Sequence, residues 1–204
     1  MLFDDTYKVI EAPVSSIYKE KGSKFLAFAE PVFNQADAMN IVNKYREQFH
    51  DARHHCFAWA IGPSLESQRM NDDGEPSGTA GRPIFGQILS FDLTNIVIVV
   101  VRYFGGIKLG VSGLITAYKT AAREALSSAV IITKTVNEVY EVLFDYPETN
   151  EVMRAIKEND LKIIKSEYSE KCRLLFSIRK NNAETASKQI ALINNVNINY
   201  LRTE

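Results

Sequence analysis

An unbroken run of six aliphatic residues, Ile96–Val101, lies near the middle of the chain. The run is long enough for a strand and too short for a membrane span, and Gly105 and Gly106 end it. A half-exposed strand would alternate hydrophobic and polar residues. We therefore predict a central strand that is buried on both faces.

A helix is predicted after this strand, because hydrophobic residues recur there in steps of three and one: Leu114, Ala117, Tyr118, Ala121, Ala122, Ala125, Leu126 and Ala129. The loop between strand and helix holds four glycines and one lysine: Gly105, Gly106, Lys108, Gly110 and Gly113. A strand, a glycine-rich turn and a helix can present backbone N–H groups to an anion at the helix start. The alternative is that the glycines only allow a tight crossing and Lys108 faces solvent.

The patterns before this region predict three strands and two helices. The strands are Tyr7–Ala12, Ser23–Val32 and His54–Ile61. One helix follows Asn34, with Asn34 or Asp37 as its cap, and a short helix spans Pro83–Phe91. Residues 64–83 contain three glycines, two prolines and no hydrophobic periodicity, so they are predicted as a loop of about 20 residues. Loops of that length are usually functional or disordered.

A change in composition divides the chain. All ten glycines lie at or before position 113, and the last 91 residues contain none. After the break, helices are predicted from Pro147 and at Ala183–Ile193, and strands at Val136–Tyr146, Leu161–Tyr168, Lys171–Arg179 and Val196–Leu201. The order βαββαβ is that of a ferredoxin-like domain. We predict an α+β protein with domains at residues 1–134 and 135–204.

Composition limits the classes of function. The chain has 46% hydrophobic and 24% charged residues, and its net charge is -1, so no global field attracts it to nucleic acid or to anionic membranes. An anion site must be a local patch. Residues 1–13 have no long apolar core and no segment approaches about 18 apolar residues, so we expect a cytoplasmic protein without signal peptide or membrane contact. Cys56 and Cys172 are predicted as free thiols.

Three histidines, His50, His54 and His55, lie close to Cys56 in the sequence. A zinc site would use His50 and His54 as an i, i+4 helical pair, but the strand predicted at His54–Ile61 does not supply that helix. On a strand, His54 and Cys56 share a face at about 6.6 Å, too far for direct contact of nucleophile and base. Neither a metal nor another cofactor is predicted.

Other candidate residues lie in the two glycine-containing loops. Four polar side chains gather in a tight turn: Asn71, Asp72, Asp73 and Glu75. They lack the spacing of an EF-hand, so a solvated turn is the alternative to a cation site. Ser77 and Thr79 lie in either an anion nest or a flexible loop. Arg102 and Lys108 are the better anion candidates, although the glycines around them match neither a Walker A motif nor a Rossmann fingerprint.

Three segments of the sequence resemble one known family. They are A-x-H-x-C-x-A at Ala52–Ala58, NDDGEPSGTAGRPI at Asn71–Ile84 and VVVRYFGGIKLG at Val99–Gly110. In this order they closely resemble the IMPACT family, whose bacterial branch comprises the YigZ-type proteins. The resemblance covers the chain to about residue 130. The remainder resembles the family's bacterial C-terminal domain by position and element order.

The resemblance implies a first domain similar to domain 2 of ribosomal protein S5, and a ferredoxin-like second domain similar to the last domain of elongation factor G. Both likenesses point toward RNA or the ribosome, by analogy of fold. Eukaryotic relatives regulate translation by competing for an activator of a stress-responsive kinase. They do so through protein contacts and an added N-terminal domain, so we do not expect that activity here. No established reaction comes with the bacterial branch.

The chain departs from the family pattern after Gly110. Ser112 stands where the pattern usually has glycine, and Thr116 stands where it has arginine. Positive charge for an anion must then come from Lys108, Arg102 and Arg82.

The first functional hypothesis is a translation-linked binding protein that contacts RNA or a ribosome-associated partner. Its groove would lie between loops 71–83 and 105–113, with Tyr103 and Phe104 available for base stacking. The binding residues expected are Arg102, Lys108, Gly105, Gly106, Ser112, Gly113, Asp72, Ser77, Thr79 and Arg82.

Two further hypotheses belong to other classes of protein. A hydrolase-like enzyme acting on a small anionic substrate would use His54 with Asp73 or Glu75 as acid and base, and would hold the anion at Lys108 and the amides of Ser112–Gly113. A protein-binding translational regulator would need neither RNA nor a substrate. The sequence favours binding over catalysis and does not predict an oligomeric state.

Overall fold

The aliphatic run at the middle of the sequence forms the centre of a five-stranded antiparallel sheet, as predicted. The computed structural model describes residues 5–204, so the first four residues of the predicted N-terminal domain lie outside it. The strand order is β2-β3-β6-β4-β5. These strands span Val14–Glu20 (β2), Ser23–Pro31 (β3), Ile96–Tyr103 (β6), His54–Ile61 (β4) and Ser67–Asn71 (β5).

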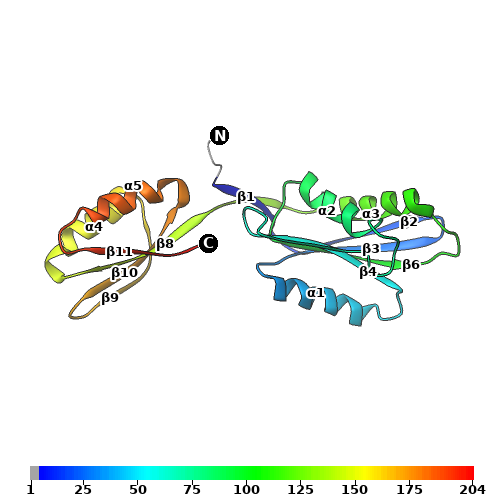
Figure 1. The fold of residues 1–204 in the computed structure, drawn as a ribbon, viewed down its shortest axis with the longest axis horizontal. Coiled ribbons are helices and arrows are strands. Elements are labelled where there is room, and N and C mark those ends of the chain that lie inside the picture. Colours follow the sequence, from blue (N-terminus) through cyan, green and yellow to red (C-terminus); the bar gives the residue numbers. More distant parts are fainter. Residues whose placement is uncertain (1–4) are drawn as a thin grey trace. The chain divides into compact units, whose positions relative to one another are not determined.

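Helices cover both faces of this sheet, which is why β6 is hydrophobic at consecutive positions (Figure 1). One face carries α2 (Gly81–Ser90) and α3 (Gly110–Ser127), and the other carries α1 (Gln35–Gln48). Ile96, Ile98 and Val100 join the core beneath α2 and α3. The alternate residues of the strand join the core beneath α1: Val97, Val99 and Val101.

A two-stranded ribbon pairs β1 (Thr6–Ile10) with β7 (Ile131–Thr135). The described chain divides into two compact units, which we call the N-terminal unit, residues 7–134, and the C-terminal unit, residues 5–6 and 135–204. Residue 5 belongs with the later residues because the Asp5 carboxylate accepts hydrogen bonds from the Arg179 side chain and the Asn181 amide.

The C-terminal unit has the predicted element order βαββαβ. Its antiparallel sheet has the order β11-β8-β10-β9, and its core lies between the sheet and two helices. The elements are β8 (Asn137–Phe144), a 3₁₀ turn (Tyr146–Glu148), α4 (Thr149–Glu158), β9 (Lys162–Tyr168), β10 (Cys172–Arg179), α5 (Lys180–Ala191) and β11 (Asn197–Thr203). Helices combined with antiparallel sheets place the chain in the α+β class.

The prediction of one long loop over residues 64–83 was wrong. β5 pairs with β4 inside it, and α2 begins at Gly81. β5 is an edge strand of mostly exposed side chains, so it needs no hydrophobic alternation to be held by backbone hydrogen bonds. α3 likewise begins at Gly110, so Gly113 lies inside the helix and not in the loop before it. No helix in the described part of the chain is long and apolar enough to cross a membrane.

Candidate functional site

Two loops of the N-terminal unit meet at the start of α3. The first follows β5 and the second follows β6, and a cavity of about 370 Å³ lies between them. The first loop contributes Glu75 and Pro76 to the cavity wall. The remaining wall comes from the end of β6, the second loop and α3: Arg102, Phe104, Lys108, Leu109, Gly110, Val111 and Leu114. The two loops singled out in the sequence therefore share one cavity.

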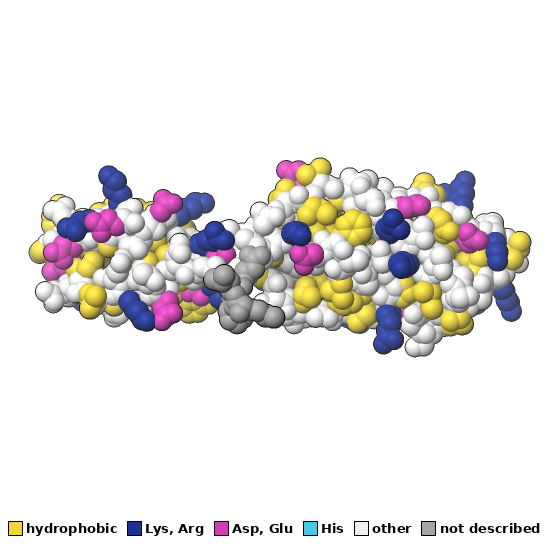
Figure 2. Space-filling model, turned by 90° about the horizontal axis from the view of Figure 1, so that it is seen from above, with side chains coloured by type: hydrophobic (Ala, Val, Ile, Leu, Met, Phe, Trp, Pro, Cys, Tyr) yellow, Lys and Arg dark blue, Asp and Glu magenta, His cyan; other side chains and the backbone are white. Residues whose placement is uncertain are grey.

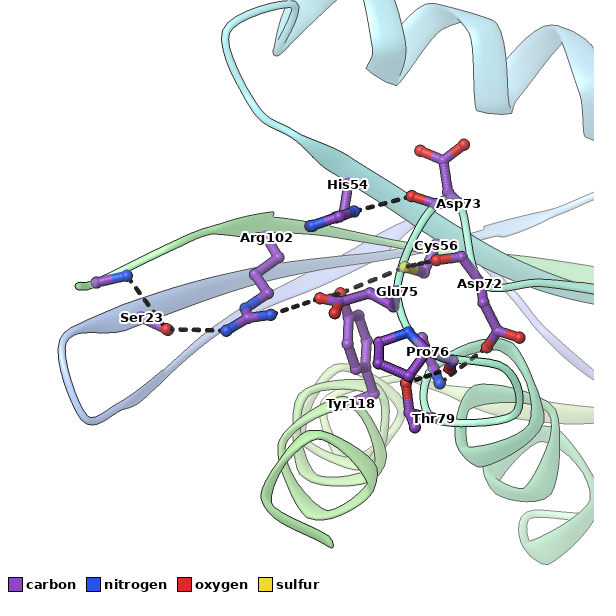
Figure 3. Close-up of polar contacts among 12 residues, drawn as sticks. Ser23, His54, Cys56, Asp72, Asp73, Glu75, Pro76, Thr79, Arg102 and Tyr118 are labelled. Carbon is purple, nitrogen blue, oxygen red and sulfur yellow. Dashed lines mark hydrogen bonds and ion pairs between the residues drawn. The ribbon is translucent and has the colours of Figure 1, made fainter. Parts of the chain in front are cut away.

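A buried chain of polar side chains forms one wall of this cavity (Figure 3). Arg102 Nη1 donates to Glu75 Oε1 at 2.6 Å, and both side chains are almost fully buried. The same oxygen accepts a hydrogen bond of 2.8 Å from the Tyr118 hydroxyl. The Arg102 charge is thus balanced by Glu75. This pair fixes the first loop against β6 and α3.

The Arg102 guanidinium retains an unused donor. Its Nη2 lies 3.4 Å from Ser23 Oγ, and its carbon lies 5.4 Å from the centroid of the Phe25 ring and 5.7 Å from that of Phe104. Arg102 Nε is buried and, among the described residues, has no hydrogen-bond partner. A buried N–H without a partner is rare in native proteins and marks a position where a bound group can supply an acceptor.

His54 and Cys56 of β4, weighed in the sequence as a nucleophile and base, do not line the cavity. The Cys56 thiol is 3.0 Å from the Asp72 carbonyl oxygen and 3.3 Å from the Tyr118 hydroxyl. Burial raises the pKa of Cys56, so the thiolate is disfavoured. His54 Nδ1 lies 2.8 Å from the Asp73 carbonyl oxygen. In the described chain, no three His, Cys, Asp or Glu side chains are placed to hold a metal ion.

The two aspartates of the first loop are bound by neighbouring protein groups. Asp72 accepts backbone N–H bonds from Gly78, Ala80 and Gly81 at 2.8 to 3.0 Å, and so caps the start of α2. The oxygens of Asp73 accept from Arg46 Nη2 at 2.9 Å and from the His55 amide at 2.7 Å. Both carboxylates therefore act as structural acceptors in the loop.

The remaining residues of the first loop do not line the cavity. Thr79 is buried and donates to the Pro76 carbonyl oxygen at 2.6 Å, while Ser77 and Arg82 are exposed. Of the first-loop residues in the predicted site, only Glu75 faces the cavity.

The start of α3 is the part of the site best placed for an anion. Its N-cap residue is Leu109, whose side chain cannot cap the helix, and no other side chain among residues 5–204 donates or accepts a capping bond there. The first residues of this 18-residue helix, Gly110 and Val111, line the cavity, so the positive end of the helix dipole lies at its wall. Lys108 lies beside them and is exposed; within residues 5–204 it forms no ion pair with a carboxylate.

The glycines of the second loop have different roles. A Cβ on Gly105 would lie 1.8 Å from the main-chain carbon of Gly22, so the loop is held against the β2–β3 turn. Gly106 has a φ of +88° and open space beside it. Ser112 and Gly113 line a separate cavity of about 240 Å³ with Tyr18 of β2.

Sequence reasoning missed three residues of the site. Tyr118 was assigned to the helix core, Ser23 to a strand, and Leu109 received no role. Leu109 lies in one of the three family segments, but nothing in its residue type indicated a role, and all three acquire their places only when β3, β6 and α3 come together. Phe104 was expected to be exposed and is 55% exposed.

Comparison with known proteins identifies the family. The Impact N-terminal domain family matches residues 21–126, a range that contains both loops and every cavity residue. The chain belongs to the IMPACT family. Its relatives include the IMPACT family member YigZ of Escherichia coli, which is 35% identical over 80% of this chain and 81% of its own length.

Another member of the IMPACT family, YvyE of Bacillus subtilis, is 34% identical over 80% of this chain and 75% of its own length. A solved structure described as that of a hypothetical protein matches 97% of this chain and 98% of its own with a TM-score of 0.73 and 30% identity. The likeness therefore extends over both units of the chain.

Proposed function

We propose that this protein is a cytoplasmic, translation-linked binding protein that holds one nucleotide unit of RNA in the cavity at the start of α3. The observation that carries the proposal is the N-terminus of α3 beside Lys108, at the end of a cavity walled by Phe104; in the described part of the chain, neither a side-chain cap nor an ion pair occupies them. Helix N-termini bind phosphate through their free N–H groups. An exposed aromatic ring offers a surface on which a base stacks.

Each part of a nucleotide has a matching part of the cavity. The phosphate lies at the amides of Gly110 and Val111, with Lys108 as the counter-charge. The base lies against Phe104, whose ring is already held over the Arg102 guanidinium.

The geometry favours binding over hydrolysis. Asp73 and His54, two of the proposed acid and base residues, do not line the cavity, and Glu75 is paired with Arg102. A hydrolase would also require a reacting group near its operating pKa, whereas burial raises the pKa of the Cys56 thiol.

We further propose that the two units correspond to domain 2 of ribosomal protein S5 and to a ferredoxin-like module. The strand order β11-β8-β10-β9 supports the second assignment, because in order within the unit it reads 4-1-3-2 with all neighbours antiparallel. These likenesses and the family membership support a role in translation, with RNA or a ribosome-associated protein as partner.

The proposal is tested by the salt dependence of binding to a fluorescent hexauridylate. Lys108→Ala is expected to weaken binding by about tenfold and to reduce the slope of log affinity against log salt by about 1. Phe104→Ala is expected to weaken binding without changing the slope, because stacking releases no counterions.

The matched control is Lys19→Ala, which removes an exposed lysine on β2 outside the cavity. It should leave affinity within about twofold of wild type. Equal losses in Lys108→Ala and Lys19→Ala, or a binding curve that does not depend on salt, would falsify the proposed function.

A further inference from the structure

A second hollow lies on the same helix α3, in the groove between α2 and α3. It has a volume of about 470 Å³. Its apolar lining comes from Pro83 and Phe91 at the two ends of α2 and from Ile115 on α3. Figure 2, which looks onto the side of the N-terminal unit that carries α2 and α3, shows hydrophobic side chains with both basic and acidic side chains among them. The groove and the proposed nucleotide cavity share no lining residue.

The rim of the groove is positively charged. Lys119 and Arg123 of α3 line it, and Arg82 is exposed in the first turn of α2. Within the described chain, no carboxylate forms an ion pair with any of these three side chains. Since the protein has a net charge of -1, the two cations that line the groove, Lys119 and Arg123, give it a local excess of positive charge.

One ridge of α3 connects this groove to the nucleotide cavity. Residues four positions apart share one face of a helix, and here they are Val111, Ile115, Lys119 and Arg123. Val111 lines the cavity, while the other three line the groove. From Val111 to Arg123 the helix rises about 18 Å, at 1.5 Å per residue, which is the length of several nucleotides.

We propose that a single strand of RNA continues from the cavity along the α2–α3 groove. Its phosphates pair with Lys119 and Arg123, and its bases lie on the apolar floor beside Phe91 and Ile115. A basic groove with stacking surfaces is the arrangement by which proteins hold single strands without reading sequence. This inference rests on the proposed function, because the strand enters the groove from the nucleotide bound at the start of α3.

The positive charge of the groove and its continuity with the nucleotide cavity favour RNA over a partner protein as the occupant. An acidic amphipathic helix of a partner protein would also match a basic rim and an apolar floor. Such a helix would not account for the helix start and Lys108 next to the groove, whereas a nucleic acid strand carries a phosphate at every nucleotide. We therefore assign the groove to RNA, and use an acidic peptide as the competing probe.

The test measures affinity as a function of RNA length. Oligouridylates of one, three and six nucleotides are titrated into wild type and the double variant Lys119→Ser/Arg123→Ser. Wild type should bind the hexamer at least about tenfold more tightly than the mononucleotide. The double variant should lose this gain and still bind the mononucleotide within about twofold of wild type.

The control Lys19→Ser/Arg53→Ser removes the same number of positive charges from exposed positions outside both hollows, and it should keep the gain. A wild-type hexamer affinity no greater than that of the mononucleotide overturns the RNA path but leaves the nucleotide cavity standing. The reverse result, a hexamer bound through Lys119 and Arg123 with no mononucleotide binding, overturns the proposed cavity. Binding of hexaglutamate in preference to hexauridylate, lost in the double variant, overturns the path in favour of a protein partner.

Discussion

The thiol of Cys56 lies in the core of the N-terminal unit with no exposed surface. Burial raises the pKa of this thiol, and the charges of Glu75, Asp73 and Asp72 raise it further, although the hydrogen bond with Tyr118 acts in the opposite direction. The thiol therefore stays protonated across the physiological range. A protonated, enclosed thiol is a packing residue and not a nucleophile.

This pKa shift predicts how stability depends on pH. In the unfolded chain a cysteine ionises near pH 8.5, whereas the folded Cys56 keeps its proton. Above that pH the unfolded state binds fewer protons than the folded state, so the Cys56 contribution to the free energy of unfolding falls as pH rises. The slope is at most about 1.4 kcal/mol per pH unit.

The measurement is urea unfolding of wild type and Cys56→Ala between pH 7 and 10, followed by the fluorescence of Trp59 in the same unit. Cys56→Ala is expected to be less stable at pH 7 because it leaves a small cavity, and the difference should shrink as pH rises. If the difference in free energy of unfolding between the two proteins does not change with pH, the thiol ionises in the folded state as it does in the unfolded state. That result would contradict the pKa shift.

Spacing in the sequence did not reveal how the polar side chains of the site are used. His54, Asp73 and Glu75 were grouped as reacting residues because they are acid and base groups within the segments that resemble the family. Their partners lie elsewhere: Arg46 and Arg102 are each 27 residues from the acids they bind, and Tyr118 is 43 residues from Glu75. Hydrogen bonds over such separations depend on the tertiary fold.

The helix α2 shows a cap supplied from outside its own first turn. Its N-cap residue is Ala80, which has no capping side chain, and the Asp72 carboxylate takes that role from the end of β5. The residue types that signal a helix start were therefore missing at the expected place. For this reason the sequence indicated Pro83 as the start of the helix, two residues late.

Removal of this cap should destabilise the N-terminal unit. Asp72→Ala is expected to lower the free energy of unfolding by about 1 to 2 kcal/mol, because three backbone N–H groups lose their acceptor. Asp72→Asn should cost less, since the amide oxygen still accepts. The neighbouring exposed Ser77 gives the control Ser77→Ala, which should match wild type in a urea titration. A loss in Ser77→Ala equal to that in Asp72→Ala contradicts the capping role.

Elements with a strong hydrophobic pattern were predictable, and edge elements were not. β6 was predicted because its two faces are buried in two different cores. β5, with the sequence SQRMN, and β2, with the sequence VSSIYKE, lie at the edges of the same sheet and are largely exposed. Backbone pairing holds such strands, and only a few of their side chains pack on the core, as Val14 and Tyr18 of β2 do, so their hydrophobic periodicity is weak.

At the scale of the molecule, the cavity and the basic groove both belong to the N-terminal unit, within the range that matches the Impact N-terminal domain. A net charge of -1 is compatible with RNA binding because Lys108 lines the cavity and Lys119 and Arg123 line the groove, which gives both hollows a local positive charge. The family was recognisable from three sequence segments. The cavity was not, because it forms only where the two loops meet the helix.

The most direct test of the account is an NMR titration of the ¹⁵N-labelled protein with uridine 5′-monophosphate. If the phosphate lies at the start of α3, the largest amide shifts fall on Gly110 and Val111, and Lys108→Ala reduces them. Largest shifts around His54 and Cys56, or no shifts at millimolar nucleotide, would contradict it.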